Sequence, residues 1–409
     1  MNNKFQEYAR LLVEVGVNIQ KGQTLLLFCP VEHAAFARMC ADVAYEDGCR
    51  EVVTIWSDDH MTRAKYLYAE DAVFTDFPQY RADMFTHYAT EKAAFLHLIS
   101  DDPENLLGVD SDRILNSHKA SGAKLKDYRA MQNANRFPWS IGALSSPKWA
   151  KKVFPNLPEA EAVEALWEKI FMAVRIQGDG SAVEAWRVHA KRLHQHAKIL
   201  NGYHFKSLHY TNSLGTDLTV ELADTHIWEA GGDVTTDGQE YMPNMPTEEC
   251  FTAPKANGVN GVVYAAMPLC RDGNVIEDIR FVLRDGKIIE ATASKGEDVL
   301  RAAISVDAGA SHFGEVALVP FDSPISNCKT LFYETLFDEN AACHFAFGSA
   351  YASNIEGGTH MTKDELIEHG INDSITHVDF MVGTRDLSIV GVTADGREIP
   401  VFVDGNFAF

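Results

Sequence analysis

A histidine and an aspartate stand two residues apart in a segment that is typical of a buried strand. His377 and Asp379 flank Val378 between Thr376 and Val382. Because side chains alternate along a strand, His377 and Asp379 would share one face and Val378 would take the other. An imidazole beside a carboxylate suits a divalent cation such as zinc, cobalt, manganese or iron. The alternative is a surface strand with one polar face, which is common in antiparallel sheets.

Two other segments place acidic residues beside apolar runs. Asp338, Glu339 and Asn340 precede a turn of small residues, after which His344 opens an apolar run. A metal site is one interpretation; the other is a helix cap from Asp338 or Asn340, with His344 satisfied inside the core. Glu315 opens a second apolar strand, where a carboxylate is costly unless it is paired or bound to a metal.

Adjacent acids, Glu248 and Glu249, lie in an extended stretch between Pro246 and Pro254. Only one of them can face a common site if the segment is a strand. The residues by themselves leave the choice open, and a solvated acidic turn is the alternative.

A helix expected over residues 183–200 carries three histidines, His189, His194 and His196. The neighbouring cations Lys191 and Arg192 would repel a metal ion, so we expect a solvated helix face there.

The first half of the chain alternates β-rich runs with helical patterns. Residues 24–28, 51–56, 95–99 and 139–143 read as buried strands, and residues 34–47 and 159–176 as helices. This order predicts an α/β domain with an open, largely parallel sheet.

Asp-Gly pairs mark the second half, at residues 272–273, 285–286, 395–396 and 404–405. They are strong hairpin signals and predict a mainly antiparallel α+β fold. We therefore expect an N-terminal α/β domain over residues 1–200 and a catalytic, metal-binding domain over residues 201–409.

Composition excludes several classes of protein. The 409 residues are 46% hydrophobic and 23% charged, which is typical of a globular protein and long enough for two domains. A net charge of −22 would repel nucleic acid and anionic lipid, and no apolar run is long enough for a membrane span. Seven cysteines without a Cys-x-x-Cys pair favour a reducing cytoplasm. Nucleotide-binding glycine motifs and the serine-hydrolase Gly-x-Ser-x-Gly motif are missing too.

Taken together, these segments resemble the M29 family of metallo-aminopeptidases, also called thermophilic aminopeptidases. The resemblance rests on residues 244–249, 314–317, 336–344, 348–351 and 376–379, in family order. Weaker matches, at residues 137–139, 149–152, 215–219 and 226–228, extend it over most of the chain.

The resemblance implies two divalent ions, of zinc, cobalt, manganese or magnesium. It makes six residues their ligands and chooses the second acid of the adjacent pair: Glu249, Glu315, Glu339, His344, His377 and Asp379. Four carboxylates and two imidazoles are chemically suited to two dications, since a carboxylate can bridge them.

The function that the resemblance implies is a two-metal aminopeptidase that removes N-terminal residues from short peptides, with metal-bound hydroxide as nucleophile. Glu315 would act as the general base and Tyr351 would donate a hydrogen bond to the oxyanion. The family also implies a homodimer whose subunits enclose a cavity that admits peptides, and the cysteines favour a cytoplasmic location.

The leading alternative is a dioxygenase that cleaves dihydroxypyridine rings, which some relatives of the family resemble. Its single iron would need only His344, His377 and Asp379. The three extra acids, Glu249, Glu315 and Glu339, would then have no metal role. The extra acids, together with Tyr351, favour the hydrolase. A non-enzymatic binding protein would instead leave these acids exposed and dispersed.

Overall fold

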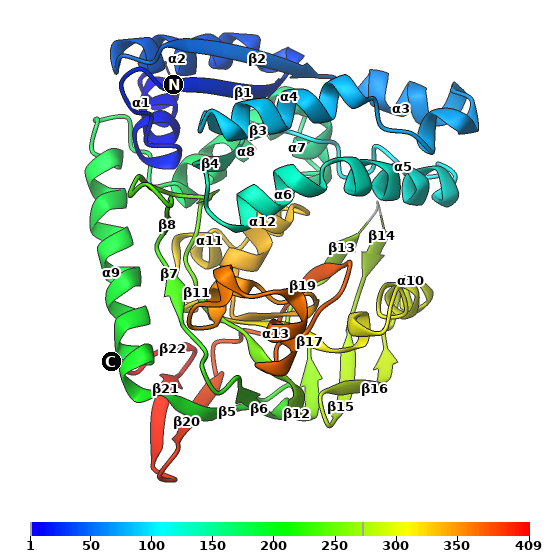
Figure 1. Cartoon of the computed structure of the whole chain (residues 1–409), viewed down its shortest axis with the longest axis vertical. Helices are drawn as coiled ribbons and strands as arrows, with labels where there is room; N and C mark the ends of the chain where they lie inside the picture. The colour runs from blue at the N-terminus through cyan, green and yellow to red at the C-terminus, as the bar shows by residue number, and fades with distance from the viewer. Residues whose placement is uncertain (1, 272–273) are drawn as a thin grey trace. The chain divides into compact units, whose positions relative to one another are not determined.

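The computed structural model describes residues 2–271 and 274–409 and divides the chain into two compact units (Figure 1). The first unit holds the residues up to Val188 together with Gly232–Pro246, and the second holds His189–Gly231 and Thr247–Phe409. The chain passes from the first unit to the second within helix α9 (Ala182–Tyr203) and later returns for one short segment. The domain boundary expected near residue 200 stays a prediction.

The first unit is built on a parallel sheet of five strands in the order β10-β4-β3-β1-β2. Their bounds are Thr24–Pro30 for β1, Glu51–Ser57 for β2, Ala94–Ile99 for β3, Trp139–Ala143 for β4 and Asn244–Met245 for β10. Two short strands, β8 (Asp233–Val234) and β9 (Glu240–Tyr241), pair separately. The predicted parallel sheet is confirmed.

Helices accompany this sheet along the chain, and their bounds follow the expected βα alternation. They are α1 (Asn2–Leu11), α2 (Ala34–Glu46), α3 (Asp59–Tyr68), α4 (Gln79–Thr90), α5 (Ser111–Lys124), α6 (Lys126–Asn133), α7 (Pro147–Val153) and α8 (Glu159–Ala173). Residues Leu25, Leu26 and Leu27 are all fully buried, so apolar groups cover both faces of β1. A parallel sheet requires this double cover, which explains the unbroken apolar sequence of the strand.

The second unit contains two antiparallel sheets, as predicted. The larger has the strand order β16-β15-β12-β6-β5-β20-β21-β22. Its strands are Phe205–Thr211 (β5), Asp217–Leu222 (β6), Pro254–Tyr264 (β12), Arg280–Arg284 (β15), Lys287–Thr292 (β16), Ser388–Thr393 (β20), Glu398–Val403 (β21) and Asn406–Phe407 (β22). The smaller has the order β19-β18-β17-β11-β7, from Glu229–Ala230 (β7), Cys250–Thr252 (β11), Phe313–Leu318 (β17), His344–Gly348 (β18) and His377–Met381 (β19).

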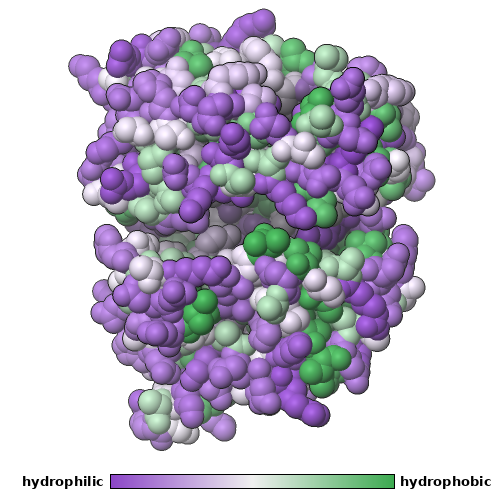
Figure 2. Space-filling model, turned by 45° about the vertical axis from the view of Figure 1, so that its right-hand side comes forward, coloured by the Kyte–Doolittle hydropathy of each residue, from purple (hydrophilic) through white to green (hydrophobic). Residues whose placement is uncertain are grey.

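Shorter elements complete this unit. They are the strand pair β13 (Leu269–Arg271) and β14 (Asn274–Ile276) and the helices α10 (Glu297–Ala303), α11 (Pro324–Asn327), α12 (Thr335–Asp338) and α13 (Lys363–Glu368). Among the described residues, no helix has both the length and the apolar character to cross a membrane. Hydrophilic side chains cover most of the face drawn in Figure 2, in keeping with the 58 acidic and 36 basic residues of the chain.

Three of the Asp-Gly pairs form the turns that the sequence predicted. Asp285 and Gly286 connect β15 to β16, and both have positive φ, which is the backbone of a type I′ hairpin. The pairs at residues 395–396 and 404–405 connect β20 to β21 and β21 to β22. The fourth pair, Asp272-Gly273, lies outside the described residues.

The five-stranded antiparallel sheet of the second unit has two unlike faces. One face packs on the eight-stranded sheet through aromatic side chains, with ring centroids 5.1 Å apart for Phe281 and Phe380 and 5.0 Å apart for Tyr210 and Phe345. Residues of the other parity therefore point away from this core, and they include Glu315, His344, His377 and Asp379.

Candidate metal centre

Small residues on β18, the strand between β17 and β19, make room on the polar face of the antiparallel five-stranded sheet. Ala346 of β18 lies between Glu315 of β17 and Asp379 of β19, and Gly348 lies opposite His377. Gly348 has φ 112°, and a Cβ there would lie 2.1 Å from the Thr376 carbonyl oxygen. The register thus brings long polar side chains together over short ones.

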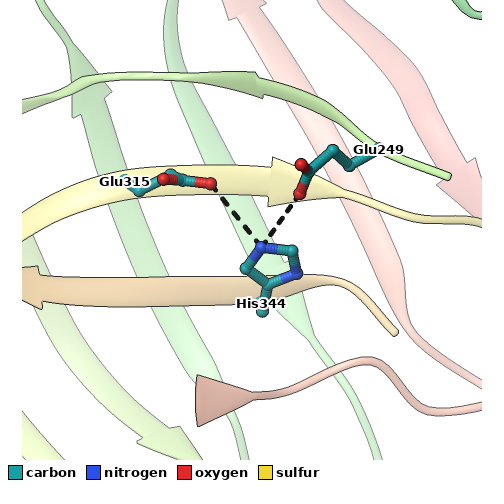
Figure 3. Close-up of side chains that lie close together, drawn as sticks. All are labelled: Glu249, Glu315 and His344. Carbon is teal, nitrogen blue, oxygen red and sulfur yellow. Dashed lines mark ion pairs between the residues drawn. The ribbon is translucent and has the colours of Figure 1, made fainter. Parts of the chain in front are cut away.

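The imidazoles and carboxylates on this face lie within contact distance of one another. His344 Nε2 is 3.2 Å from Glu249 Oε2 and 3.6 Å from Glu315 Oε1, and Figure 3 shows both carboxylates directed at this ring. His377 Nε2 is 3.2 Å from Glu315 Oε2 and 3.3 Å from Asp379 Oδ1. The two oxygens of Glu315 therefore face different imidazoles.

Two sets of donors that could each hold a metal ion share this one carboxylate. Glu249, Glu315 and His344 form the first set, and Glu315, His377 and Asp379 form the second, with the ligand atoms of each set within 4.8 Å of one another. Carboxylate oxygens and imidazole nitrogens are the donors that zinc, cobalt and manganese accept. The chemistry and spacing of the residues in each set fit a divalent metal ion.

Charge pairing dominates the electrostatics of the centre. Burial alone would raise the pKa of Glu315, but hydrogen bonds with His344 and His377 hold that pKa at about 2. Burial likewise opposes a charged imidazole, yet the surrounding carboxylates raise the pKa of His344 and of His377 well above the ordinary value. Metal ligation requires neutral imidazoles, so bound cations would take over the charge that these protons supply.

Glu249 and Glu339 come from outside the strands, and Glu339 belongs to neither donor set found among the described residues. Glu249 immediately precedes β11, and Glu339 begins the short 3-10 helix η5 (Glu339–Ala341). Loss of water, together with Asp379 and Glu249 nearby, raises the pKa of Glu339 well above its usual range, and burial raises the pKa of Glu249. Carboxylates so close together repel one another unless a cation offsets their charge.

Tyr351 lies beside the centre, on the loop after β18. Its ring centroid is 5.1 Å from that of His377 and 6.1 Å from that of Phe251. The charge of His377 lowers the phenol's pKa, but loss of water and the nearby carboxylates raise it further, so the hydroxyl keeps its proton. Since 46% of the residue is exposed, an incoming substrate can reach it.

Several of the non-metal alternatives raised by the sequence are wrong. Glu248 and Glu249 are only 3% and 8% exposed, so they form no solvated turn. Asp338 accepts hydrogen bonds from the backbone of Phe332 and Glu334. The side-chain oxygen of Asn340 accepts one from the backbone of Glu248, 92 residues away, so it does not serve as the capping oxygen of a local helix.

The solvated helix face predicted for the three histidines is also wrong at His189. Its side chain is 9% exposed, and Nε2 lies 2.9 Å from the Thr247 carbonyl oxygen and 3.4 Å from Glu248 Oε2. The helix packs against a segment far along the chain, a contact that no local spacing reveals. His189 and Asn340 are thus polar residues next to the centre that sequence reasoning missed.

Comparison with known proteins extends over the full chain. The family model described as thermophilic metalloprotease (M29) matches residues 1–407. Aminopeptidase AmpS of Bacillus subtilis is 45% identical over 408 residues, with 100% of this chain and 99% of the relative covered. Aminopeptidase 2 of Geobacillus stearothermophilus is 43% identical over 406 residues, with 99% and 98% covered.

Solved structures also match over nearly the full chain. Wild-type AmpT from Thermus thermophilus matches with a TM-score of 0.93 and 36% identity, and 100% of each chain is covered. A 2,5-dihydroxypyridine dioxygenase from Pseudomonas putida matches with a TM-score of 0.50 and 11% identity, covering 99% of this chain and 96% of the other. The second likeness concerns the fold alone.

Proposed function

This chain belongs to the M29 family of metalloproteases and is an aminopeptidase, and we propose that it uses two divalent metal ions to release N-terminal residues from short peptides. The observation that carries the two-metal proposal is the position of Glu315, whose two oxygens belong to two different donor sets.

The resemblance implies the six ligands, and the two donor sets suggest how five of them divide between the ions. Glu249 and His344 would hold one ion and His377 and Asp379 the other, with Glu315 between them. Glu339, whose pKa responds to Asp379 and Glu249, would complete the set. Bound ions of this kind lower the pKa of a water molecule and polarise a carbonyl group.

Protein groups perform the remaining steps. Glu315 would take the proton of the attacking water and pass it to the leaving amine. Tyr351, which keeps its proton, would donate a hydrogen bond to the oxyanion.

The dioxygenase alternative finds less support in the geometry. It needs His344, His377 and Asp379 around one iron, but neither donor set found among the described residues contains both imidazoles. The buried acids Glu249 and Glu315 would also remain without a cation.

Metal analysis tests the proposal. Protein purified without chelator should contain two divalent ions per chain and cleave Leu-p-nitroanilide, and dialysis against EDTA should abolish cleavage until a divalent metal is restored. A single iron per chain together with ring cleavage of a dihydroxypyridine would overturn it.

Two further properties are proposed from the family resemblance. A cytoplasmic location is supported by the seven cysteines, which all lie within the described residues and are all free thiols. A homodimer should give a molar mass of twice 45.3 kDa in light scattering after size-exclusion chromatography.

A further inference from the structure

The six proposed ligands are held in two different ways. Glu315, His344, His377 and Asp379 lie within β17, β18 and β19, whose ladder hydrogen bonds fix the backbone. Glu249 and Glu339 lie just outside any strand, so the sheet does not position them directly. Metal ligands need accurate placement, which these two must obtain from other contacts.

One fully buried side chain connects the two loop-borne ligands. Asn340 Oδ1 accepts a hydrogen bond of 2.8 Å from the backbone N–H of Glu248, the residue before Glu249. Its Nδ2 donates to the Leu336 carbonyl oxygen at 3.0 Å and to Glu339 Oε1 at 3.4 Å. A single amide thus contacts the backbone beside one ligand and the carboxylate of the other.

A side chain of α9 contacts the other side of the peptide unit between Thr247 and Glu248. His189 Nε2 lies 2.9 Å from the carbonyl oxygen of Thr247. Residues 247–249 therefore lie between His189 and Asn340. The backbone before Glu249 is restrained by side chains from two elements.

From these contacts we propose that Asn340 is a positioning residue of the metal centre, which sets the place of Glu249 through the Glu248 N–H and the orientation of Glu339 through Nδ2. The inference rests on the proposed function, since it needs both acids to be metal ligands. Groups that orient ligands in this way commonly change metal affinity by about 10- to 100-fold when they are removed.

A purely structural role would give a different result, and the chain offers a matched control. Asn201 also clamps a distant backbone with both amide atoms, since Oδ1 accepts from Trp228 N at 2.8 Å and Nδ2 donates to Trp228 O at 2.9 Å. It makes no hydrogen bond to the proposed ligands among those described. Asn201→Ala should lower the melting temperature and leave metal binding unchanged.

The test is titration of the chelator-stripped, full-length protein with Co²⁺ alone, followed by visible absorption and calorimetry. Asn340→Ala should bind at least one Co²⁺ about 10- to 100-fold more weakly than the wild type. Asn340→Thr, which keeps the volume but cannot reach Glu248, should show the same loss if the alanine variant does not fold.

The outcomes separate this inference from the proposed function. Co²⁺ binding within twofold of the wild type in folded Asn340→Ala or Asn340→Thr would overturn the positioning role and leave the centre intact. Wild-type protein that binds no Co²⁺, or binding that survives the double change of His344 and His377 to Ala, would overturn the metal centre itself.

Discussion

The two units place their acidic residues differently around a central sheet. In the first unit, both faces of the central strand β1 are buried, and the acids Asp59 and Asp101 come only after β2 and β3 have ended. In the second unit, the five-stranded sheet has one apolar face, and Glu315 and Asp379 lie within the strands. An antiparallel sheet can leave one face polar, so it can carry charged groups at its middle.

The units also differ in what faces each acid. Asp101 has the carboxylates of Asp59 and Glu32 as neighbours, and partial loss of water together with Asp59 raises its pKa to about 6. Glu315 has two imidazoles as neighbours, which hold its pKa at about 2. The comparison indicates that neighbouring imidazoles stabilise a negative charge, whereas neighbouring carboxylates oppose it.

The largest effect should come from the paired strand residues. Replacing His377 or Asp379 with Ala should remove metal and lower aminopeptidase activity by on the order of 10⁴-fold, because the ions supply several kcal/mol of transition-state stabilisation. Metal content and turnover of Leu-p-nitroanilide measure this. Val378, on the apolar face and 6% exposed, is the control: Val378→Ala should keep metal and cost about 2 kcal/mol of stability. Equal metal loss in all three variants would break the distinction between the two faces.

The second largest effect on activity should come from Glu315→Gln. The amide keeps the shape but cannot accept the proton of the attacking water, so kcat should fall by about 10³-fold, within the range of general-base effects. Metal content should be measured on the same sample, since Glu315 is also a proposed ligand. Activity near that of the wild type would remove Glu315 from both roles.

Tyr351→Phe should have a smaller effect, limited to the rate of the chemical step. Both metals and KM should be retained while kcat falls by about 10²-fold, because the hydrogen bond to the oxyanion forms mainly in the transition state. Steady-state kinetics with metal analysis checks this. Loss of metal in this variant would instead make Tyr351 a support for the ligands.

The smallest effect belongs to the first unit and concerns stability against pH. A carboxyl whose folded pKa is raised contributes stability below its unfolded pKa, near 4, and this contribution is lost as pH rises through about 6. Asp101→Asn should therefore melt at a higher temperature than the wild type at pH 7.5, with the difference shrinking toward pH 4.5. Calorimetry at both values measures it.

For Asp386 we expect the opposite effect of charge on stability, since hydrogen bonds from Ser213 and Thr384 lower its pKa to about 2. Asp386→Asn should melt below the wild type at pH 7.5. The same direction of change in both variants would contradict the contrast drawn here.

Local patterns predicted much of the fold and part of the centre. Alternation placed His377 and Asp379 on one face because a strand has a fixed period, and Asp-Gly pairs marked hairpins because few residues accept positive φ at both turn positions. The choice between Glu248 and Glu249 could not come from spacing alone. The burial of His189 and the bond from Glu248 to Asn340 depend on contacts between distant segments, which local patterns do not encode.

The return of Gly232–Pro246 to the first unit restricts how genes of this family can recombine. Strand β10 lies in this segment and pairs with β4, so a gene fragment that ends after α9 would encode a sheet with an unpaired edge at β4. Unpaired strand edges promote aggregation. A productive crossover must therefore supply two separated stretches from compatible parents, which favours inheritance of the chain as a whole. The full-length match of relatives from Bacillus and Geobacillus agrees with such inheritance.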